Sequence, residues 1–118
     1  MSPPAEIQWL NGIAVGPGNH ALVVGEKGTI FATSDDAQTF DARTAPGNED
    51  LYAVAFSPDG ARALAVGAHG AAYASVDGGI TWTDRSTGVD GFLGDVIFID
   101  NQTAMVVGAA GLVATTTL

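Results

Sequence analysis

The sequence predicts an all-β repeat protein, and three observations lead to this prediction. An apolar run of strand type occurs three times, at residues 10–15, 51–56 and 93–98. Each copy is followed by a second apolar run that ends in glycine, at residues 21–25, 63–67 and 104–108. The copies begin 41 and 42 residues apart. Several short strands at a period of about 40 residues are typical of the blades of a β-propeller.

The middle copy shows how one blade is built. Its four expected antiparallel strands cover residues 51–57, 61–67, 71–75 and 83–86. The first two are joined by a tight turn, in which Pro58 presets φ and Gly60 accepts a positive φ. A second turn is expected at residues 68–70. By the same pattern we expect a closing strand at 1–9, a first blade at 10–50, a second at 51–92 and part of a third at 93–118.

A polar run joins the third and fourth strands of the second copy. Ser75, Asp77, Gly79 and Trp82 follow one another in the order Ser-x-Asp-x-Gly-x-Thr-Trp. The short Ser and Asp side chains can hydrogen-bond to the amides of a turn, and glycine permits the reversal. Trp82 can then cover the hairpin with a large apolar face. This run resembles the Asp-box of bacterial neuraminidase (BNR) repeats, and the resemblance implies a structural role for it.

The first copy carries a shorter version of the run. Ser34, Asp36 and Phe40 are expected to take the places of the serine, aspartate and tryptophan, with one residue fewer and no glycine. Taken together, residues 10–118 resemble the repeats of propellers of the photosystem II stability/assembly-factor-like type. Similar repeats occur in sortilin-type receptors and in some xyloglucan hydrolases. The resemblance implies a β-propeller; assembly factors of this type engage a photosystem subunit through a basic surface.

Composition excludes several kinds of partner. The chain has 118 residues, a net charge of −9 and four basic residues. A protein this acidic repels phosphate backbones and anionic lipid surfaces, so neither nucleic acid nor a membrane is expected as a partner. The absence of cysteine excludes disulfides and thiolate metal sites, and we expect no cofactor. The N-terminal residues lack the segments of a signal peptide, which predicts a cytoplasmic protein.

The two ends of the sequence predict that copies of the chain form a ring. The third copy stops before a fourth strand, whereas residues 2–9 precede the first copy and residues 6–9 alternate between polar and apolar. We expect this N-terminal strand to complete the third blade of another chain. Two chains would give six blades and three would give nine; because rings of about four to eight blades are known, a homodimer is favoured over a homotrimer. The alternative is a piece of a longer propeller.

Five residues are candidates for binding a ligand. The turns between second and third strands share one face of the ring with the connections between blades, and binding residues concentrate in such loops. The candidates on this face are Lys27, His69, Asp90 and Phe92. Asp95 is the fifth, because it places a carboxylate on a first strand, beside the central channel. His20 is expected on the face opposite His69, which argues against a shared metal or acid–base site.

These residues predict a non-enzymatic binding scaffold with a protein or other ligand on one face. The alternative is a carbohydrate-binding module or a glycoside-hydrolase-like propeller fragment. Glycoside cleavage needs two carboxylates in different roles, and Asp95 could supply only two equivalent copies in a dimer. No phosphate-binding loop or nucleophile elbow occurs. Sugar sites need exposed aromatic platforms, and only Phe92 and Trp9 are expected to offer one, which favours the scaffold.

Overall fold

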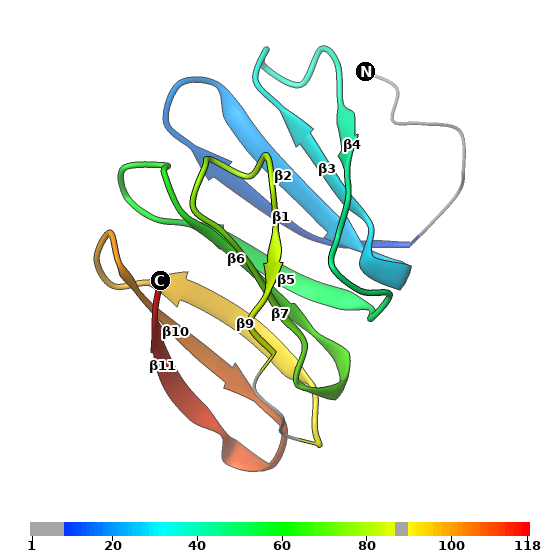
Figure 1. Cartoon of the computed structure of the whole chain (residues 1–118), viewed down its shortest axis with the longest axis vertical. Coiled ribbons are helices and arrows are strands. Elements are labelled where there is room, and N and C mark those ends of the chain that lie inside the picture. Colours follow the sequence, from blue (N-terminus) through cyan, green and yellow to red (C-terminus); the bar gives the residue numbers. More distant parts are fainter. Residues whose placement is uncertain (1–8, 87–89) are drawn as a thin grey trace.

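The computed structural model describes residues 9–86 and 90–118, and this part of the chain forms three antiparallel β-sheets (Figure 1). The first sheet consists of β1 (Leu10–Gly16), β2 (His20–Gly25), β3 (Ile30–Thr33) and β4 (Asp41–Arg43). The second consists of β5 (Leu51–Phe56), β6 (Ala63–Gly67), β7 (Ala72–Ser75) and β8 (Thr83–Asp84). The third consists of β9 (Leu93–Phe98), β10 (Thr103–Gly108) and β11 (Val113–Thr117).

The strand order confirms the predicted propeller blades. Each sheet pairs its strands in sequence order, and the three sheets are stacked along the long axis of the molecule (Figure 1). The first strands β1, β5 and β9 lie next to one another, as the inner strands of a propeller do. Of the predicted closing strand at residues 1–9, only Trp9 belongs to the described part of the chain.

All three first strands share one irregularity. The pairing register shifts between Leu10 and Gly12 in β1, between Leu51 and Ala53 in β5, and at the matching place opposite Gly108 in β9. Such a bulge leaves one residue outside the ladder and increases the local twist of the strand. The residues displaced in this way are Asn11, Tyr52 and Gly94.

The core lies between the sheets. One cluster fills the space between the first and second sheets; it contains Leu22, Val24, Ile30, Ala32, Leu51, Val54, Ala63, Ala65, Ala71, Tyr73 and Trp82. Another fills the space between the second and third sheets; it contains Ala53, Leu64, Val66, Ala72, Ala74, Leu93, Val96, Ala104 and Val106. Because the second sheet is covered on both faces, all five residues of β6 are buried. This accounts for the continuous apolar run of that strand.

The turns between second and third strands are three copies of one structure. Short 3₁₀ turns occupy Glu26–Gly28, Ala68–Gly70 and Ala109–Gly111. The middle residue of each, namely Lys27, His69 or Ala110, has a φ between 57° and 59°. Such a left-handed conformation is uncommon outside glycine. The glycine that follows also has a positive φ in all three turns, so the predicted hairpin turn repeats in detail.

The polar run of the second sheet forms a hairpin whose amides are bound by side chains. Ser75 Oγ donates to Asp77 Oδ1 at 2.7 Å and accepts from the Gly79 amide at 2.8 Å. Asp77 Oδ1 accepts from the amides of Ile80 at 3.1 Å and Thr81 at 2.9 Å, and the Thr81 hydroxyl donates to Asp77 Oδ2. The two side chains therefore replace the backbone partners that a reversal of this shape lacks.

In the first sheet, the residues of this hairpin lie one position earlier than predicted. Thr33 Oγ1 donates to Asp35 Oδ1 at 2.7 Å, and Thr39 donates to Asp35 from its amide and its hydroxyl at 3.0 and 2.6 Å. The assignment of these roles to Ser34 and Asp36 is therefore wrong. The hydroxyl of Thr33 takes the part that the Ser75 hydroxyl has in the second sheet. The first hairpin therefore has the same length as the second. Ala37 stands where Gly79 stands in the second sheet, and both have a positive φ.

Trp82 covers the second hairpin and also joins two sheets. Its indole Nε1 donates to the Gly79 carbonyl at 3.0 Å, and the side chain is only 8% exposed. It belongs to the cluster between the first and second sheets. Phe40 holds the corresponding place in the first sheet and is half-buried.

The hairpin aspartates are held in their ionised form. Hydrogen bonds from the Thr39 hydroxyl, the Thr39 amide and the Thr33 hydroxyl lower the pKa of Asp35 from 3.8 to about 2. For Asp77, burial raises the pKa, but bonds from the Thr81 hydroxyl and amide and from Ser75 outweigh it and lower the pKa to about 2. Both carboxylates accept bonds that a protonated acid would lose in part.

Trp82→Ala should lower the free energy of unfolding by about 3–5 kcal/mol, because it removes a buried aromatic side chain from between two sheets. Urea unfolding measured by circular dichroism provides the value. Trp9→Ala is the control, since Trp9 is 76% exposed and its loss should change stability little. A Trp82 variant within about 0.5 kcal/mol of the parent would contradict the packing described here.

Asp35→Asn and Asp36→Asn test the position of the first hairpin. Asp35→Asn removes one charged acceptor oxygen from the bonds with Thr33 and Thr39, so the midpoint of urea unfolding should fall. Asp36→Asn should leave the midpoint unchanged, because asparagine tolerates the left-handed φ of 61° at that position. If Asp36→Asn were the more damaging change, the predicted alignment with Ser34 would be right after all.

Lowering the pH from 5 to 2 should destabilise the chain partly through Asp35 and Asp77. A carboxyl with a folded pKa of about 2 and an unfolded pKa of 3.8 stabilises the fold above pH 4, and this contribution is lost as the pH falls toward 2. The double variant Asp35→Asn/Asp77→Asn should show a shallower loss of stability over this range. Equal slopes for parent and double variant would exclude these two groups as the cause.

Candidate ligand-binding face

The 3₁₀ turns and the connections between sheets meet at one end of the strands, which we call the turn face. The Gly28 amide donates to the Glu49 carbonyl at 2.8 Å, and the Ala68 amide donates to the Asp50 carbonyl at 2.8 Å. The Ala109 amide donates to the Phe92 carbonyl at 2.9 Å in the same way. The first connection is therefore fixed by the backbone to both turns beside it and the second to the turn of the third sheet, so their side chains are presented on a rigid support.

Lys27 and His69 lie on the turn face, on either side of the connection between the first two sheets. The Lys27 amide donates to Asp50 Oδ1 at 3.0 Å. His69 Nδ1 lies 3.1 Å from both carboxylate oxygens of Glu49, and both side chains are exposed. The two predicted candidates thus occupy equivalent turns and have acidic neighbours.

Asp90 and Phe92 line a groove at the third sheet. Its volume is about 330 Å³, and it is lined by Asp90, Gly91, Phe92, Ala109, Ala110 and Leu112. The Phe92 side chain is 51% exposed. Its ring meets that of Tyr52 edge to face, with the centroids 6.1 Å apart and the planes at 82°. This pair offers an exposed aromatic surface whose position is held by contact between two sheets.

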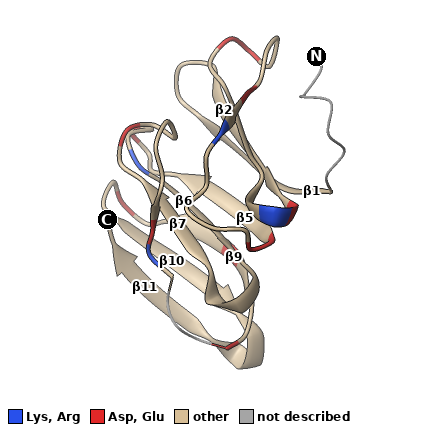
Figure 2. Cartoon of the chain, turned by 45° about the vertical axis from the view of Figure 1, so that its right-hand side comes forward, with Lys and Arg blue, Asp and Glu red and all other residues tan. Residues whose placement is uncertain are grey.

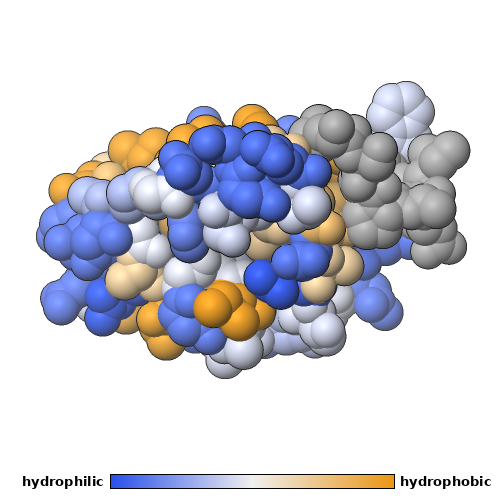
Figure 3. Space-filling view, turned by 90° about the horizontal axis from the view of Figure 1, so that it is seen from above, coloured by the Kyte–Doolittle hydropathy of each residue, from blue (hydrophilic) through white to orange (hydrophobic). Residues whose placement is uncertain are grey.

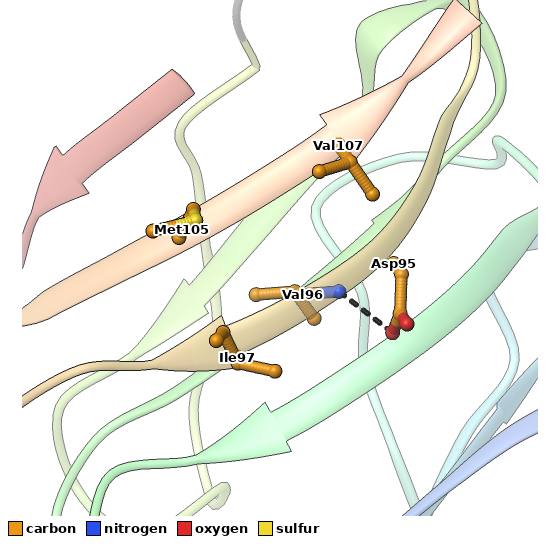
Figure 4. Close-up of a pocket in the computed structure, with 5 residues that line it drawn as sticks. All are labelled: Asp95, Val96, Ile97, Met105 and Val107. Carbon is orange, nitrogen blue, oxygen red and sulfur yellow. Dashed lines mark hydrogen bonds between the residues drawn. The ribbon is translucent and has the colours of Figure 1, made fainter. Parts of the chain in front are cut away.

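Asp95 stands apart from these four candidates. It lies on β9 opposite Val107, at the position held by Gly12 in β1 and Ala53 in β5. The side chain borders a shallow hollow of about 180 Å³, which Val96, Ile97, Met105 and Val107 also line (Figure 4). Its Oδ1 accepts from the Val96 amide at 2.9 Å. Because no second ionisable residue lines this hollow in the described chain, the surroundings of Asp95 do not supply the carboxylate pair of a glycosidase.

The turn face is predominantly acidic. Most Asp and Glu residues of the described chain lie in loops at the ends of the strands rather than within the sheets (Figure 2). Those on the turn face are Glu26, Glu49, Asp50 and Asp90, and its basic side chains are Lys27 and His69. Such a surface attracts basic groups and repels acidic ones.

A cavity on the opposite face was not predicted from the sequence. It has a volume of about 150 Å³ and lies between the first two sheets, where His20, Asp41, Arg43 and Asp77 are among the lining residues. Arg43 Nε is buried there without a hydrogen-bond partner. His20 is exposed and lies near the second hairpin, so the prediction that it and His69 occupy opposite faces is confirmed. The sequence gives no signal for this group, because its members come together only when two sheets stack.

Two arginines of the second sheet bind the end of β11. Arg62 Nε donates to the Leu118 carbonyl at 3.2 Å, and an Arg85 side-chain nitrogen donates to the Thr117 carbonyl at 3.0 Å. They therefore join sheets rather than forming an anion site. Within residues 9–86 and 90–118, no three His, Cys, Asp or Glu side chains are placed to hold a metal ion. In the same residues, no helix is long and apolar enough to cross a membrane.

Comparison with known proteins identifies the architecture. No family model matches the sequence, and no curated protein does. Among solved structures, YCF48 from Cyanidioschyzon merolae superposes with a TM-score of 0.81 at 25% identity, over 97% of this chain and 35% of that one. YCF48 bound to D1 peptide gives a TM-score of 0.78 at 22% identity, over 92% of this chain and 38% of that one.

Propellers of glycoside hydrolase family GH74 are also similar. An ancestral GH74 enzyme gives a TM-score of 0.71 at 17% identity, over 93% of this chain and 19% of that one. The GH74 enzyme of Niastella koreensis gives a TM-score of 0.69 at 19% identity, over 98% of this chain and 17% of that one. The chain spans just over a third of the length of the YCF48 chains. These likenesses show that the described chain has the architecture of a set of β-propeller blades.

Proposed function

We propose that this chain is a non-enzymatic β-propeller scaffold that binds a protein ligand on its turn face. The observation that carries the proposal is the exposed Tyr52–Phe92 pair beside a groove of about 330 Å³, on an acidic surface. An apolar anchor can enter the groove while the surrounding carboxylates attract basic groups. We therefore propose a ligand segment with an apolar side chain flanked by Lys or Arg. A solved YCF48 structure with a bound D1 peptide supports a peptide ligand by analogy.

The remaining parts of the proposal follow the repeat pattern. We propose that the hairpins at Asp35 and Asp77 are Asp-boxes of the BNR type. In both hairpins the aspartate accepts a hydrogen bond from the amide of the threonine four residues further along the chain. We propose that copies of the chain close a ring, with two copies giving six blades or three giving nine. Two expectations from the sequence stay predictions. One is that an N-terminal strand of another copy completes the third sheet, and the other is a cytoplasmic location.

A carbohydrate ligand is the second candidate. One observation favours it, namely the exposed Phe92 ring with Asp90 in the same groove, since sugars stack on aromatic rings beside polar groups. The GH74 enzymes are only 17 and 19% identical to this chain, so their similarity concerns the fold alone. Because the Tyr52 ring meets Phe92 edge to face, the aromatic surface is stepped rather than flat, which suits a side chain better than a sugar ring.

A peptide library displayed on phage and selected on the immobilised parent chain tests the protein-binding proposal. Phe92→Ala should weaken binding of the selected peptides at least about tenfold, because it removes the anchor surface of the groove. Val76→Ala is the matched control: Val76 is exposed but lies on the opposite face, so binding should not change. Peptides bound equally by the parent and Phe92→Ala would exclude this groove as their site.

A panel of neutral oligosaccharides, including xyloglucan fragments, tests the second candidate. Saturable binding that is lost in Phe92→Ala would replace the peptide proposal by a carbohydrate one. If the sugars do not bind while basic peptides do, the carbohydrate candidate is excluded.

A further inference from the structure

The third sheet exposes one apolar face, which we call the third-sheet open face. It consists of Asp95, Ile97, Met105, Val107 and Val113. Ile97 is 53% exposed and Val113 64%, although isoleucine and valine are usually buried. Figure 4 shows Ile97, Met105 and Val107 beside Asp95 around the hollow on this face.

The first sheet exposes a matching face at the other end of the molecule, which we call the first-sheet open face. It consists of Ile13, Val15, Ala21 and Val23. Ile13 is 69% exposed and Val15 78%. Figure 3 looks onto the end of the molecule formed by the first sheet, where hydrophobic residues reach the surface beside hydrophilic ones.

Both open faces repeat positions that are buried inside the molecule. The register places Ile97 and Met105 where the second sheet has Ala55 and Leu64, which pack against the third sheet. It places Ile13 and Val23 where the second sheet has Val54 and Ala65, which pack against the first sheet. The third-sheet open face therefore corresponds to the side of the second sheet that packs on the third sheet. The first-sheet open face corresponds to the side of the second sheet that packs on the first sheet.

We infer that the third-sheet open face of one copy packs onto the first-sheet open face of a second copy, in a head-to-tail joint that repeats the contact between neighbouring sheets within the chain. This inference rests on the proposed ring and names the surfaces that close it. The two halves are different surfaces, so the contact is heterologous, and two such joints between two copies close a ring of six blades.

Asp95 is the only charged residue of the two open faces, and its equivalents in the other two sheets are uncharged. Neighbouring first strands approach closely: a Cβ on Gly12 would lie 3.0 Å from the Ala53 Cα atom. Glycine and alanine hold this position in the first two sheets, whereas the third sheet has a carboxylate that the joint would take out of water. Because desolvating an unpaired carboxylate is costly, Asp95 weakens the joint.

Light scattering of purified full chains tests the inference. The parent should have about twice the mass of 11.9 kDa. Ile13→Asp and Val107→Asp each block one half of the joint, so each should be a folded monomer by circular dichroism, with self-association weakened at least about a hundredfold. An equimolar mixture of the two variants should again form pairs, because one intact joint remains between them. Val76→Asp, an exposed change outside both faces, should keep the parent mass.

Several outcomes would overturn the inference. If only one of the two variants loses the parent mass, a face packs on a copy of itself. If both keep it, the copies still associate but not through these faces. The mixed pair has one joint and the parent ring has two, so the mixture is expected to associate more weakly than the parent. A mixture that associates no more strongly than either variant alone excludes the head-to-tail joint. A monomeric parent excludes the joint and the ring together while leaving peptide binding untouched. Asp95→Ala is an independent test, because it should strengthen self-association about tenfold or more relative to the parent. Unchanged self-association would show that Asp95 does not lie in the joint.

Discussion

Every blade of this protein is apolar on both faces and depends on a neighbour to cover them. The second sheet meets this requirement fully, which is why all five residues of β6 are buried. The first and third sheets meet it on one side only, through the two core clusters. The same positions that form those clusters are exposed at the ends, at Ile13 and Ile97 among others. The need to stack sheets therefore governs both the stability of the chain and its capacity to associate.

The hairpins at Asp35 and Asp77 supply hydrogen-bond partners that the backbone lacks, since a sharp reversal between short strands leaves amides without backbone partners. A hydroxyl followed two residues later by an aspartate supplies those partners in both complete sheets. The bonds hold both aspartates ionised, with a pKa of about 2. Trp82 adds a link that spans two sheets. Asp35 and Asp77, on the face opposite the turn face, thus have a structural role.

The turn face combines features that the fold itself does not use. Phe92 is exposed although its neighbour Leu93 is fully buried, and its ring rests on Tyr52, a residue displaced by the strand bulge. The bulge thus turns an inner strand residue toward the connection of the next sheet. An aromatic pair fixed in this way is a low-entropy anchor for a partner. The binding proposal depends on this arrangement, whereas the joint between copies depends on the sheet faces, so the two can succeed or fail separately.

The sequence by itself determined the repeat, the strands, the turn types and the equivalence of Gly12, Ala53 and Asp95, because these depend on local spacing and conformational preference. It misplaced the first hairpin because Ser34 matches Ser75 in residue type; Thr33 and Asp35 keep the full spacing to Thr39 and Phe40, and they make the observed bonds. Tertiary structure alone decided which distant residues come together: Tyr52 meets Phe92, Arg62 and Arg85 bind the end of β11, and Arg43 and Asp77 line one cavity between two sheets. The physical reason is that these contacts arise from the stacking of one sheet on the next, which no periodicity within a single strand encodes.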